Sequence, residues 1–474
     1  MPDLLTSASF TSTMAARSRA RSCLLLLMLW NLPKSLSLRS TTRISSTRLA
    51  MSTAASLLQE RLASFPSTYD CKLAVVIAGG GGHFLASLAA TPGASKVLLD
   101  GCLPYNRESM RQYVQSDEME YCSANAANKA SRAALRKALR LSSAVDPKYG
   151  HSPLEHQVLS VGVGCTSALR SGAVSGPGKA FVCVTQADGR QTQLALEMSE
   201  GQSRFEEDLV VSHAILSAIE WALDESMGVS TVGDEVVSFD RSPDLSDPND
   251  SIRQAAERVL SGEDSCVMLL PWKGSFRRLE HAFLPPMAMV FPGSFNPPHK
   301  GHVALTNAAL EKSSSSMVFF ELSITNPDKP SLEVDDIVSR LEEFWSLDLP
   351  PEWGVLLTNA PLFADKMKLL DNLQSTRSFA VQPQLNFCIG TDTLVRIIDP
   401  KYYNNSWDEM VETLRSMPCK FVAGGRMAQK GEAGFVSGEE DVARLPEDLR
   451  DKFTLLPEFR VDISSTELRR QRSR

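Results

Sequence analysis

The residues of this chain that are best suited to chemistry are His299 and His302, within a stretch that reads GSFNPPHKGH from Gly293. The apolar run 287–291 before it predicts a buried strand, and residues 303–312 after it predict a helix. Two histidines three residues apart lie on one face of a first helical turn. The free N–H groups and the dipole of a helix start attract an anion. The pattern therefore predicts a site for the phosphates of a nucleotide triphosphate.

The elements that must position these histidines alternate between strands and helices. We predict strands at 288–291, 317–323, 354–357, 386–389 and 420–422, and helices at 302–311, 334–345, 407–414 and 465–472. This order is typical of an open, Rossmann-like parallel sheet covered by helices. Such a sheet binds its ligand at the carboxyl ends of the strands, where the strand order reverses.

The first half of the chain shows the same alternation. We predict strands at 72–78, 96–99, 157–163, 179–185 and 193–198, and helices at 83–90, 123–141 and 205–223. Residues 230–250 are rich in Ser, Asp and Pro and predict a linker, with a short helix at 253–260 and a strand at 267–270 after it. The fold class is therefore α/β with two domains, 59–226 and 286–474, joined by the linker segment 227–285.

Composition limits the classes of function. A chain of 474 residues is too long to fold around a single hydrophobic core, so more than one domain is expected. Without residues 1–59 the chain has 42 basic and 55 acidic residues, a balance of −13, which does not favour nucleic-acid binding. The nine cysteines form no CxxC pair, so neither a zinc ribbon nor a disulfide framework is expected, and a reducing compartment is favoured. No third zinc ligand lies at a usual spacing from the two histidines, so a zinc site is not predicted there and we expect no bound structural metal.

The segment 1–58 differs from the rest in composition. It is rich in Ser, Thr and Arg, and no acidic residue occurs between Asp3 and Glu60. Its apolar run 23–32 is too short to span a bilayer, so no stable membrane span is expected. We expect a targeting or disordered segment that directs the protein to a plastid or mitochondrion. If translation starts at Met51, the expected location is the cytoplasm.

The histidine stretch and three later segments together resemble one family. GSFNPPHKGH resembles the signature of the HxGH nucleotidyltransferases, and its GSFNP form is most similar to nicotinamide or nicotinate mononucleotide adenylyltransferases. The segments FCIGTDTL from Phe387 and ISSTELR from Ile463 resemble two further motifs of that family in the same order. Asn326-Pro327-Asp328-Lys329, followed by Arg340, is similar to a stretch between them. The resemblance covers residues 286–474.

The resemblance implies an adenylyltransferase that moves AMP from ATP, accompanied by Mg²⁺, to nicotinamide or nicotinate mononucleotide and releases pyrophosphate, in NAD biosynthesis. It implies catalytic roles for His299, His302 and Arg469, and contacts with the mononucleotide by Asn326, Lys329 and Arg340. Ser465, at a predicted helix start, is expected to be an N-cap residue. The residues implied to bind ATP are Gly293, Ser294, Phe295, Gly301, Gly390, Asp392, Ser465 and Thr466.

Other functions are compatible with the same residues. Pantetheine phosphate, or an alcohol phosphate paired with CTP, would use the same two histidines. A nucleotide-binding regulator or ATPase without transfer activity would keep the fold. In each case the partners are small-molecule nucleotides, and a homo-oligomer is compatible with the sequence. Neither the preference between nicotinamide and nicotinate nor the oligomeric state follows from the residues.

Residues 72–223 resemble the CinA C-terminal domain, the nicotinamide-nucleotide amidase family. The carrying segments are Gly80-Gly81-Gly82, Thr91-Pro92-Gly93-Ala94-Ser95, Tyr105-Asn106-Arg107-Glu108 and the run from Val161 to Gly178. The family's catalytic serine falls on Ala78, its threonine on Gly80, and its lysine near Met110. A methyl group cannot replace a nucleophilic hydroxyl. We therefore expect a pseudoenzyme domain that binds a mononucleotide at residues 79–82, mediates oligomerisation or serves as a scaffold.

Overall fold

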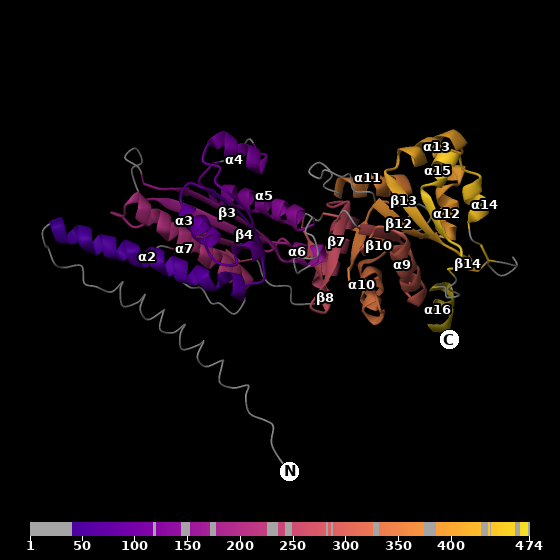
Figure 1. The fold of residues 1–474 in the computed structure, drawn as a ribbon, viewed down its shortest axis with the longest axis horizontal. Helices are drawn as coiled ribbons and strands as arrows, with labels where there is room; N and C mark the ends of the chain where they lie inside the picture. Colours follow the sequence, from indigo (N-terminus) through magenta and orange to yellow (C-terminus); the bar gives the residue numbers. More distant parts are fainter. Residues whose placement is uncertain are drawn as a thin grey trace, which may run out of the picture. The chain divides into compact units, whose positions relative to one another are not determined.

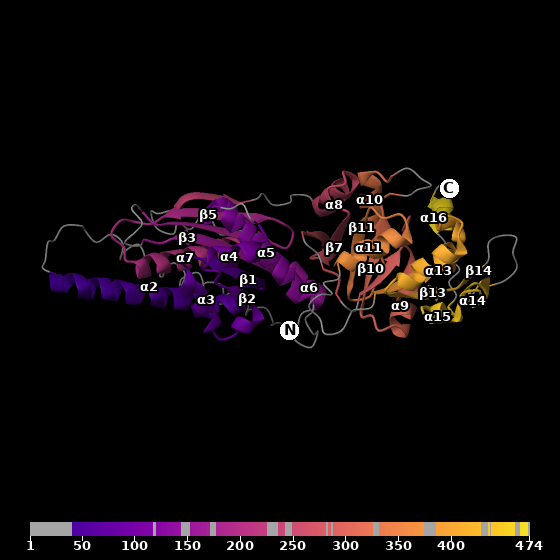
Figure 2. The same cartoon turned by 90° about the horizontal axis from the view of Figure 1, so that it is seen from above.

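A computed structural model describes most of the chain (Figures 1 and 2). The residues that it describes are 40–116, 120–143, 152–170, 177–224, 236–241, 249–280, 283–285, 288–325, 331–373, 385–427, 435–436, 438–459 and 465–472. The chain divides into a short unit, Met1–Ser56, and a large unit, Leu57–Arg474, which holds two separate sheets.

The first sheet has six strands in the order β2-β1-β3-β4-β5-β6. Strand β1 pairs in parallel with both β2 and β3, whereas the remaining neighbours are antiparallel. The first strand in sequence is thus flanked on both sides by later parallel strands, and the strand order reverses there. The strands are β1 (Lys72–Ala78), β2 (Leu98–Cys102), β3 (Ser160–Ala168), β4 (Lys179–Gln186), β5 (Gln191–Glu197) and β6 (Val236–Arg241).

Helices cover both faces of the first sheet. Alternate residues of β1 point to opposite faces, so Leu73 and Val75 join a core with α3 and α7, and Ala74 and Val76 join one with α4 and α5. The helices are α2 (Ser40–Thr68), α3 (Gly82–Ala89), η1 (Ala94–Lys96), α4 (Arg107–Val114), α5 (Ala124–Ser142), α6 (Pro153–Val158) and α7 (Arg204–Leu223). Within the large unit, Leu58, Leu62 and Phe65 of α2 are buried in the core with α3 and α7.

The second sheet has eight strands in the order β16-β13-β12-β9-β10-β11-β7-β8. The six from β16 to β11 run parallel, and the β7–β8 hairpin extends the sheet in antiparallel fashion. Strand β9 lies between β10 and β12, which places the reversal of strand order at β9. The strands are β7 (Cys266–Trp272), β8 (Ser275–Leu279), β9 (Ala288–Pro292), β10 (Met317–Ser323), β11 (Trp353–Thr358), β12 (Leu385–Gly390), β13 (Cys419–Gly424) and β16 (Phe453–Leu456), with a separate pair β14 (Arg426–Met427) and β15 (Phe435–Val436).

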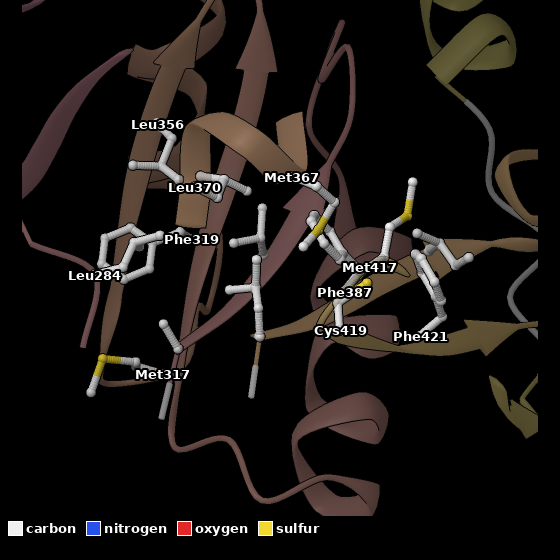
Figure 3. Close-up of a cluster of buried hydrophobic side chains, with 14 of the residues drawn as sticks. Leu284, Met317, Phe319, Leu356, Met367, Leu370, Phe387, Met417, Cys419 and Phe421 are labelled. Atoms are coloured by element: carbon white, nitrogen blue, oxygen red, sulfur yellow. The ribbon is translucent and has the colours of Figure 1, made fainter. Parts of the chain in front are cut away.

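Each face of the second sheet has its own core. Residues of α8, α9 and α10 pack on one face, and residues of α11, α12, α13 and α15 on the other (Figure 1). Figure 3 shows the second core, where Leu370 lies near Phe319 and Met367 near Phe387. The helices are α8 (Asp250–Leu260), α9 (Lys300–Lys312), α10 (Val334–Glu342), η4 (Glu343–Ser346), α11 (Phe363–Leu373), α12 (Thr391–Ile397), η6 (Pro400–Tyr402), α13 (Trp407–Ser416), α14 (Glu439–Ala443), α15 (Glu447–Arg450) and α16 (Ser465–Arg472).

One strand predicted for the first sheet differs from the structure, and two predicted segments contain regular elements. The strand predicted at 157–163 is wrong at its start, because α6 occupies Pro153–Val158 and β3 begins at Ser160. A capping box between Ser152 and Glu155, with proline at the first turn, starts that helix. Residues 40–58 of the expected targeting segment lie in α2, whose Ala, Leu and Arg favour a helix. The linker segment 227–285 supplies β6 to the first sheet and α8, β7 and β8 to the second.

The end of the β7–β8 hairpin contacts the turn between β4 and β5. The backbone N–H of Glu280 donates to the carbonyl of Ala187 at 2.7 Å, and Arg278 Nη2 donates to the carbonyl of Asp188 at 3.0 Å. The Glu280 carboxylate pairs with Arg132 and Arg278, each at 3.0 Å. Its side chain is 11% exposed, so this ion pair is more protected from solvent than an ordinary surface pair. We call this contact the hairpin junction.

Candidate functional site

The histidine loop, residues 293–302, follows β9 at the reversal of strand order. The N–H of Gly293 donates to the carbonyl of Glu321 at 2.9 Å, which ties the start of the loop to β10. Phe295 has a left-handed backbone, with φ of 41°, and its ring turns back over Gly293. A Cβ atom at position 293 would lie 2.6 Å from that ring, so glycine is required there. The Asn296–Pro297 peptide bond is cis.

The two histidines cap the helix that follows the loop. His299 is the N-cap residue of α9, and its Nδ1 accepts a hydrogen bond from the N–H of Gly301 at 3.1 Å. The Nδ1 of His302 accepts from the N–H of His299 at 3.0 Å. The pair therefore fulfils the role that a serine and a glutamate have in an ordinary capping box. Both side chains are fixed by the backbone that they cap.

These hydrogen bonds set the tautomer of both rings. A neutral imidazole that accepts at Nδ1 carries its proton on Nε2, so each ring presents one N–H donor away from the backbone. Burial lowers the pKa of His302 to about 3, with a smaller contribution from His299, and burial also lowers the pKa of His299. Both rings are thus neutral donors near pH 7. Such donors suit phosphate oxygens without transferring a proton to them.

Aromatic residues hold the His302 ring in place. The rings of His299 and His302 are stacked, with centroids 3.8 Å apart. The edge-on rings of Phe291 and Phe295 lie 5.7 Å and 5.1 Å from His302. Phe295 is almost fully buried and also packs against Phe320 at 5.5 Å. The resemblance implied only ATP binding for Phe295, but its ring also supports a histidine, a role that the sequence pattern does not reveal.

Two arginines from distant elements contact the same loop. Arg340 Nη1, from α10, donates to the carbonyl of Ser294 at 3.0 Å, and Arg469 Nη1, from α16, donates to the carbonyl of Asn296. The guanidinium groups are close enough for Arg469 to lower the pKa of Arg340, although burial contributes more. The structure thus brings Arg340 and Arg469, 129 positions apart, to one loop with both histidines. Two cations and two neutral donors around a helix start can bind a polyphosphate.

The remaining predicted residues lie on several elements. Gly390 ends β12, next to β9, and a Cβ atom there would meet no atom within 4 Å. Asp392 is exposed in the first turn of α12. Ser465 is the first residue of α16, at the start predicted for this helix, and thus not the N-cap residue before it. Its hydroxyl donates to the carbonyl of Pro297 at 3.0 Å. Thr466 follows it in α16.

Two predicted contacts with the mononucleotide, Asn326 and Lys329, lie outside the described residues.

The sequence patterns did not reveal a buried polar cluster at the carboxyl ends of β10 and β11. Glu321 accepts from Lys366 Nζ at 2.7 Å and from the hydroxyl of Thr358. Both charged side chains are at least 93% buried. A buried ion pair contributes little net stability, and here its carboxylate belongs to the residue that anchors Gly293.

Within the described part of the chain, no three histidine, cysteine, aspartate or glutamate side chains come together in a way that could hold a metal ion. Likewise, none of the helices described is both long and apolar enough to cross a membrane.

Comparison with known proteins gives several likenesses. A putative nicotinamide mononucleotide adenylyltransferase of Schizosaccharomyces pombe is 32% identical over 116 residues, 24% of this chain and 43% of that protein. A probable nicotinate-nucleotide adenylyltransferase of Gloeobacter violaceus is 26% identical over 188 residues, 38% of this chain and 82% of that protein. The chain thus spans less than half the length of the first relative and about four fifths of the second.

Two solved structures are similar at low identity. Competence/damage inducible protein CihA from Agrobacterium tumefaciens is 16% identical, with a TM-score of 0.26 over 36% of this chain and 94% of that one. Plasmodium falciparum nicotinic acid mononucleotide adenylyltransferase complexed with NaAD is 16% identical, with a TM-score of 0.26 over 39% of this chain and 82% of that one. Residues 290–471, which hold the histidine loop and both arginines, match the cytidylyltransferase-like family.

Proposed function

We propose that the second half of the chain is an adenylyltransferase that joins ATP to nicotinamide or nicotinate mononucleotide. The observation that carries the proposal is the convergence of His299, His302, Arg340 and Arg469 on one loop at the carboxyl end of β9. The family match and the names of two relatives support a nucleotidyltransferase with a pyridine mononucleotide as acceptor.

The reaction needs positioning more than covalent help. A phosphate oxygen of the mononucleotide attacks the α-phosphorus of ATP, the bond to the β-phosphate breaks, and pyrophosphate leaves. Most of the barrier comes from crowded negative charge and from alignment of the reacting oxygens. Fixed donors that need no rearrangement during the reaction lower such a barrier most effectively.

Each residue then has a distinct role. The Nε2–H groups of His299 and His302 donate to phosphate oxygens as charge develops, and their neutrality lets them do so without proton transfer. Arg469 offers a planar fork to the β- and γ-phosphates, and Arg340 a second one. Gly390 and Asp392, at the end of the neighbouring strand β12, face the ribose of ATP.

Mg²⁺ would accompany the triphosphate as part of the substrate. Mg²⁺ prefers oxygen ligands and keeps several waters. The described residues around the loop offer imidazoles and guanidinium groups, and no acidic cluster is found among the described residues. Phosphate oxygens and water would therefore supply its ligands, and it would reduce the charge repulsion between the phosphates.

The test is a two-product assay with the full chain. Purified protein is incubated with Mg²⁺-ATP and, separately, nicotinamide mononucleotide, nicotinate mononucleotide or pantetheine phosphate, with a CTP arm in parallel. We expect pyrophosphate and dinucleotide in equal amounts with at least one pyridine mononucleotide. Pyrophosphate release only with pantetheine phosphate would assign another acceptor, and release only with CTP would assign another nucleotide donor. ATP hydrolysis without any dinucleotide would contradict transfer.

A further inference from the structure

The first sheet contains a second glycine-rich turn at a matching place in the fold. The glycine turn, residues 79–82, follows β1, which is flanked by parallel strands on both sides, and leads into α3. Turns of this kind often receive the phosphate of a nucleotide, because their N–H groups point to one spot. The turn is available to a ligand only if these N–H groups do not already donate to other groups of the protein.

One carboxylate, that of Asp208, accepts hydrogen bonds from three backbone N–H groups at the end of the turn and the start of α3. The Oδ1 of Asp208, from α7, accepts from Gly81 at 2.8 Å and from Gly82 at 3.2 Å. Its Oδ2 accepts from the backbone N–H of His83 at 3.2 Å and contacts His83 Nδ1 at 2.5 Å. Although burial opposes ionisation, these four hydrogen bonds lower the pKa of Asp208. The carboxylate therefore lies ionised where an anionic ligand would bind.

Two serines take the N–H groups on either side. The N–H of Gly80 donates to the hydroxyl of Ser167 at 2.5 Å, and the N–H of Phe84 donates to the hydroxyl of Ser212 at 3.1 Å. Ser212 lies one helical turn after Asp208 on α7. Five consecutive N–H groups, from residue 80 to residue 84, thus donate to side chains of the protein itself.

Packing explains the glycines without a ligand. A Cβ atom on Gly80 would lie 2.6 Å from Leu169, and one on Gly81 would lie 2.7 Å from Ile215. Gly79 and Gly81 also have φ of 102°, a conformation that favours glycine. The Cβ side of these glycines is therefore packed by the protein's own residues, whereas the N–H groups of Gly81 and Gly82 face Asp208.

We propose that Asp208 is a built-in anion that closes the glycine turn, so that this turn does not bind the phosphate of a mononucleotide. Of the three roles expected for the first domain, this leaves oligomerisation or scaffolding. The proposal is independent of adenylyl transfer, because it concerns the other sheet.

The experiment counts mononucleotide sites on the full chain by equilibrium dialysis with labelled nicotinamide mononucleotide. Asp208→Ala removes the carboxylate and frees three N–H groups, and we expect it to bind one equivalent more than the unaltered chain. Asp208→Asn is the matched control, because its side-chain oxygen can still accept from the N–H groups of Gly81 and Gly82, and we expect no added equivalent. An unchanged count for a folded Asp208→Ala chain would overturn the proposal, as would a gain in both variants.

A measurement on the unaltered chain covers the case in which Asp208→Ala fails to fold. The amide signals of Gly81, Gly82 and His83 are followed by NMR in ¹⁵N-labelled protein during titration with nicotinamide mononucleotide to millimolar concentration. We expect no shift at these three amides, whether or not signals of the histidine loop respond. A saturable shift at all three would mean that the ligand reaches the turn, and the proposal would be wrong.

Discussion

The histidine loop and the glycine turn occupy the same place in their sheets, yet they present opposite charge. Each follows the strand at which the strand order of its sheet reverses, and each leads into a helix. At the histidine loop the helix is capped by neutral imidazoles, and Arg340 and Arg469 lie beside it. At the glycine turn the cap is the carboxylate of Asp208. The chain therefore has one turn suited to an anion and one that already holds an anion.

This difference shows what a glycine-rich turn between strand and helix can predict. Glycines allow a tight turn and close approach, but either a ligand or the protein itself can fill the space beside them. The deciding residue at the glycine turn, Asp208, lies about 126 positions away on another helix. A glycine pattern alone is therefore weak evidence for a phosphate site, whereas the histidine loop includes its own donors.

The largest expected effect is the loss of adenylyl transfer when a histidine of the histidine loop, and not one beside the glycine turn, is replaced. Removing one preorganised donor typically costs about 10²–10³ in kcat, so His302→Ala should lower adenylyl transfer by that factor or more. His83→Ala is the matched control at the glycine turn and should leave the rate unchanged. Pyrophosphate release measures both. Full activity of a folded His302→Ala variant would contradict the assignment of the catalytic site.

A smaller effect is expected at the arginine that reaches the histidine loop from the end of the chain. Arg469→Ala removes charge-assisted donors worth about 1.5–3 kcal/mol, so kcat/KM for ATP should fall about 10- to 100-fold. Arg469→Lys keeps the charge but loses the planar fork and should recover only part of the loss. A rate for Arg469→Lys equal to that of the unaltered chain would mean that the fork is not used. Steady-state kinetics at varied ATP concentration gives the comparison.

A stability measurement tests the other turn. Asp208→Ala leaves several N–H groups of α3 without their acceptor, and loss of a helix cap costs up to about 2 kcal/mol. We expect the free energy of unfolding of the first domain to fall by about that amount, while adenylyl transfer per folded molecule is unchanged. Asp208→Asn should lose much less. Denaturant unfolding, followed by tryptophan fluorescence, provides the values.

The smallest expected effect is a difference in pH dependence. The pKa of His302 is about 3 in the folded protein and about 6.5 when unfolded, so the unfolded state binds more protons between these values. Stability should therefore be complete above pH 6.5 and fall below it, by about 1 kcal/mol at pH 5.5 from this residue. His302→Gln should lack that loss. Asp208, whose folded pKa is lowered, contributes stability that is lost only below about pH 4.

Sequence patterns located most of the second sheet because local signals agree there. The strand predicted at 317–323 and the helix at 465–472 have these bounds in the structure, since apolar runs and polar flanks define them. Helix α11 was missed, because its sequence FADKMKLLDNL has a weak apolar stripe and one of its three buried residues is the charged Lys366. Local composition cannot show that this lysine pairs with Glu321, 45 positions away.

In the candidate site, too, local sequence indicated some residues, whereas others depend on contacts between distant elements. Motif spacing indicated His299, His302 and Arg469, and the structure brings them to one loop. The role of the Phe295 ring, the anchor at Glu321 and the cap by Asp208 depend on contacts between distant elements, which a single sequence does not reveal. The bounds of α16 were predicted, but Ser465 is its first residue and not its N-cap, because cap positions depend on backbone geometry more than on composition.

The hairpin junction has a practical consequence for dividing the chain. A fragment beginning at residue 286 would keep the histidine loop but lose β7 and β8, and the backbone N–H and carbonyl groups of β11 that face them would become an open edge. Open edges recruit other strands, so such a fragment should self-associate. Cutting before α8, at about residue 249, would keep that edge covered, although the contacts of the hairpin with Arg132, Ala187 and Asp188 would be lost.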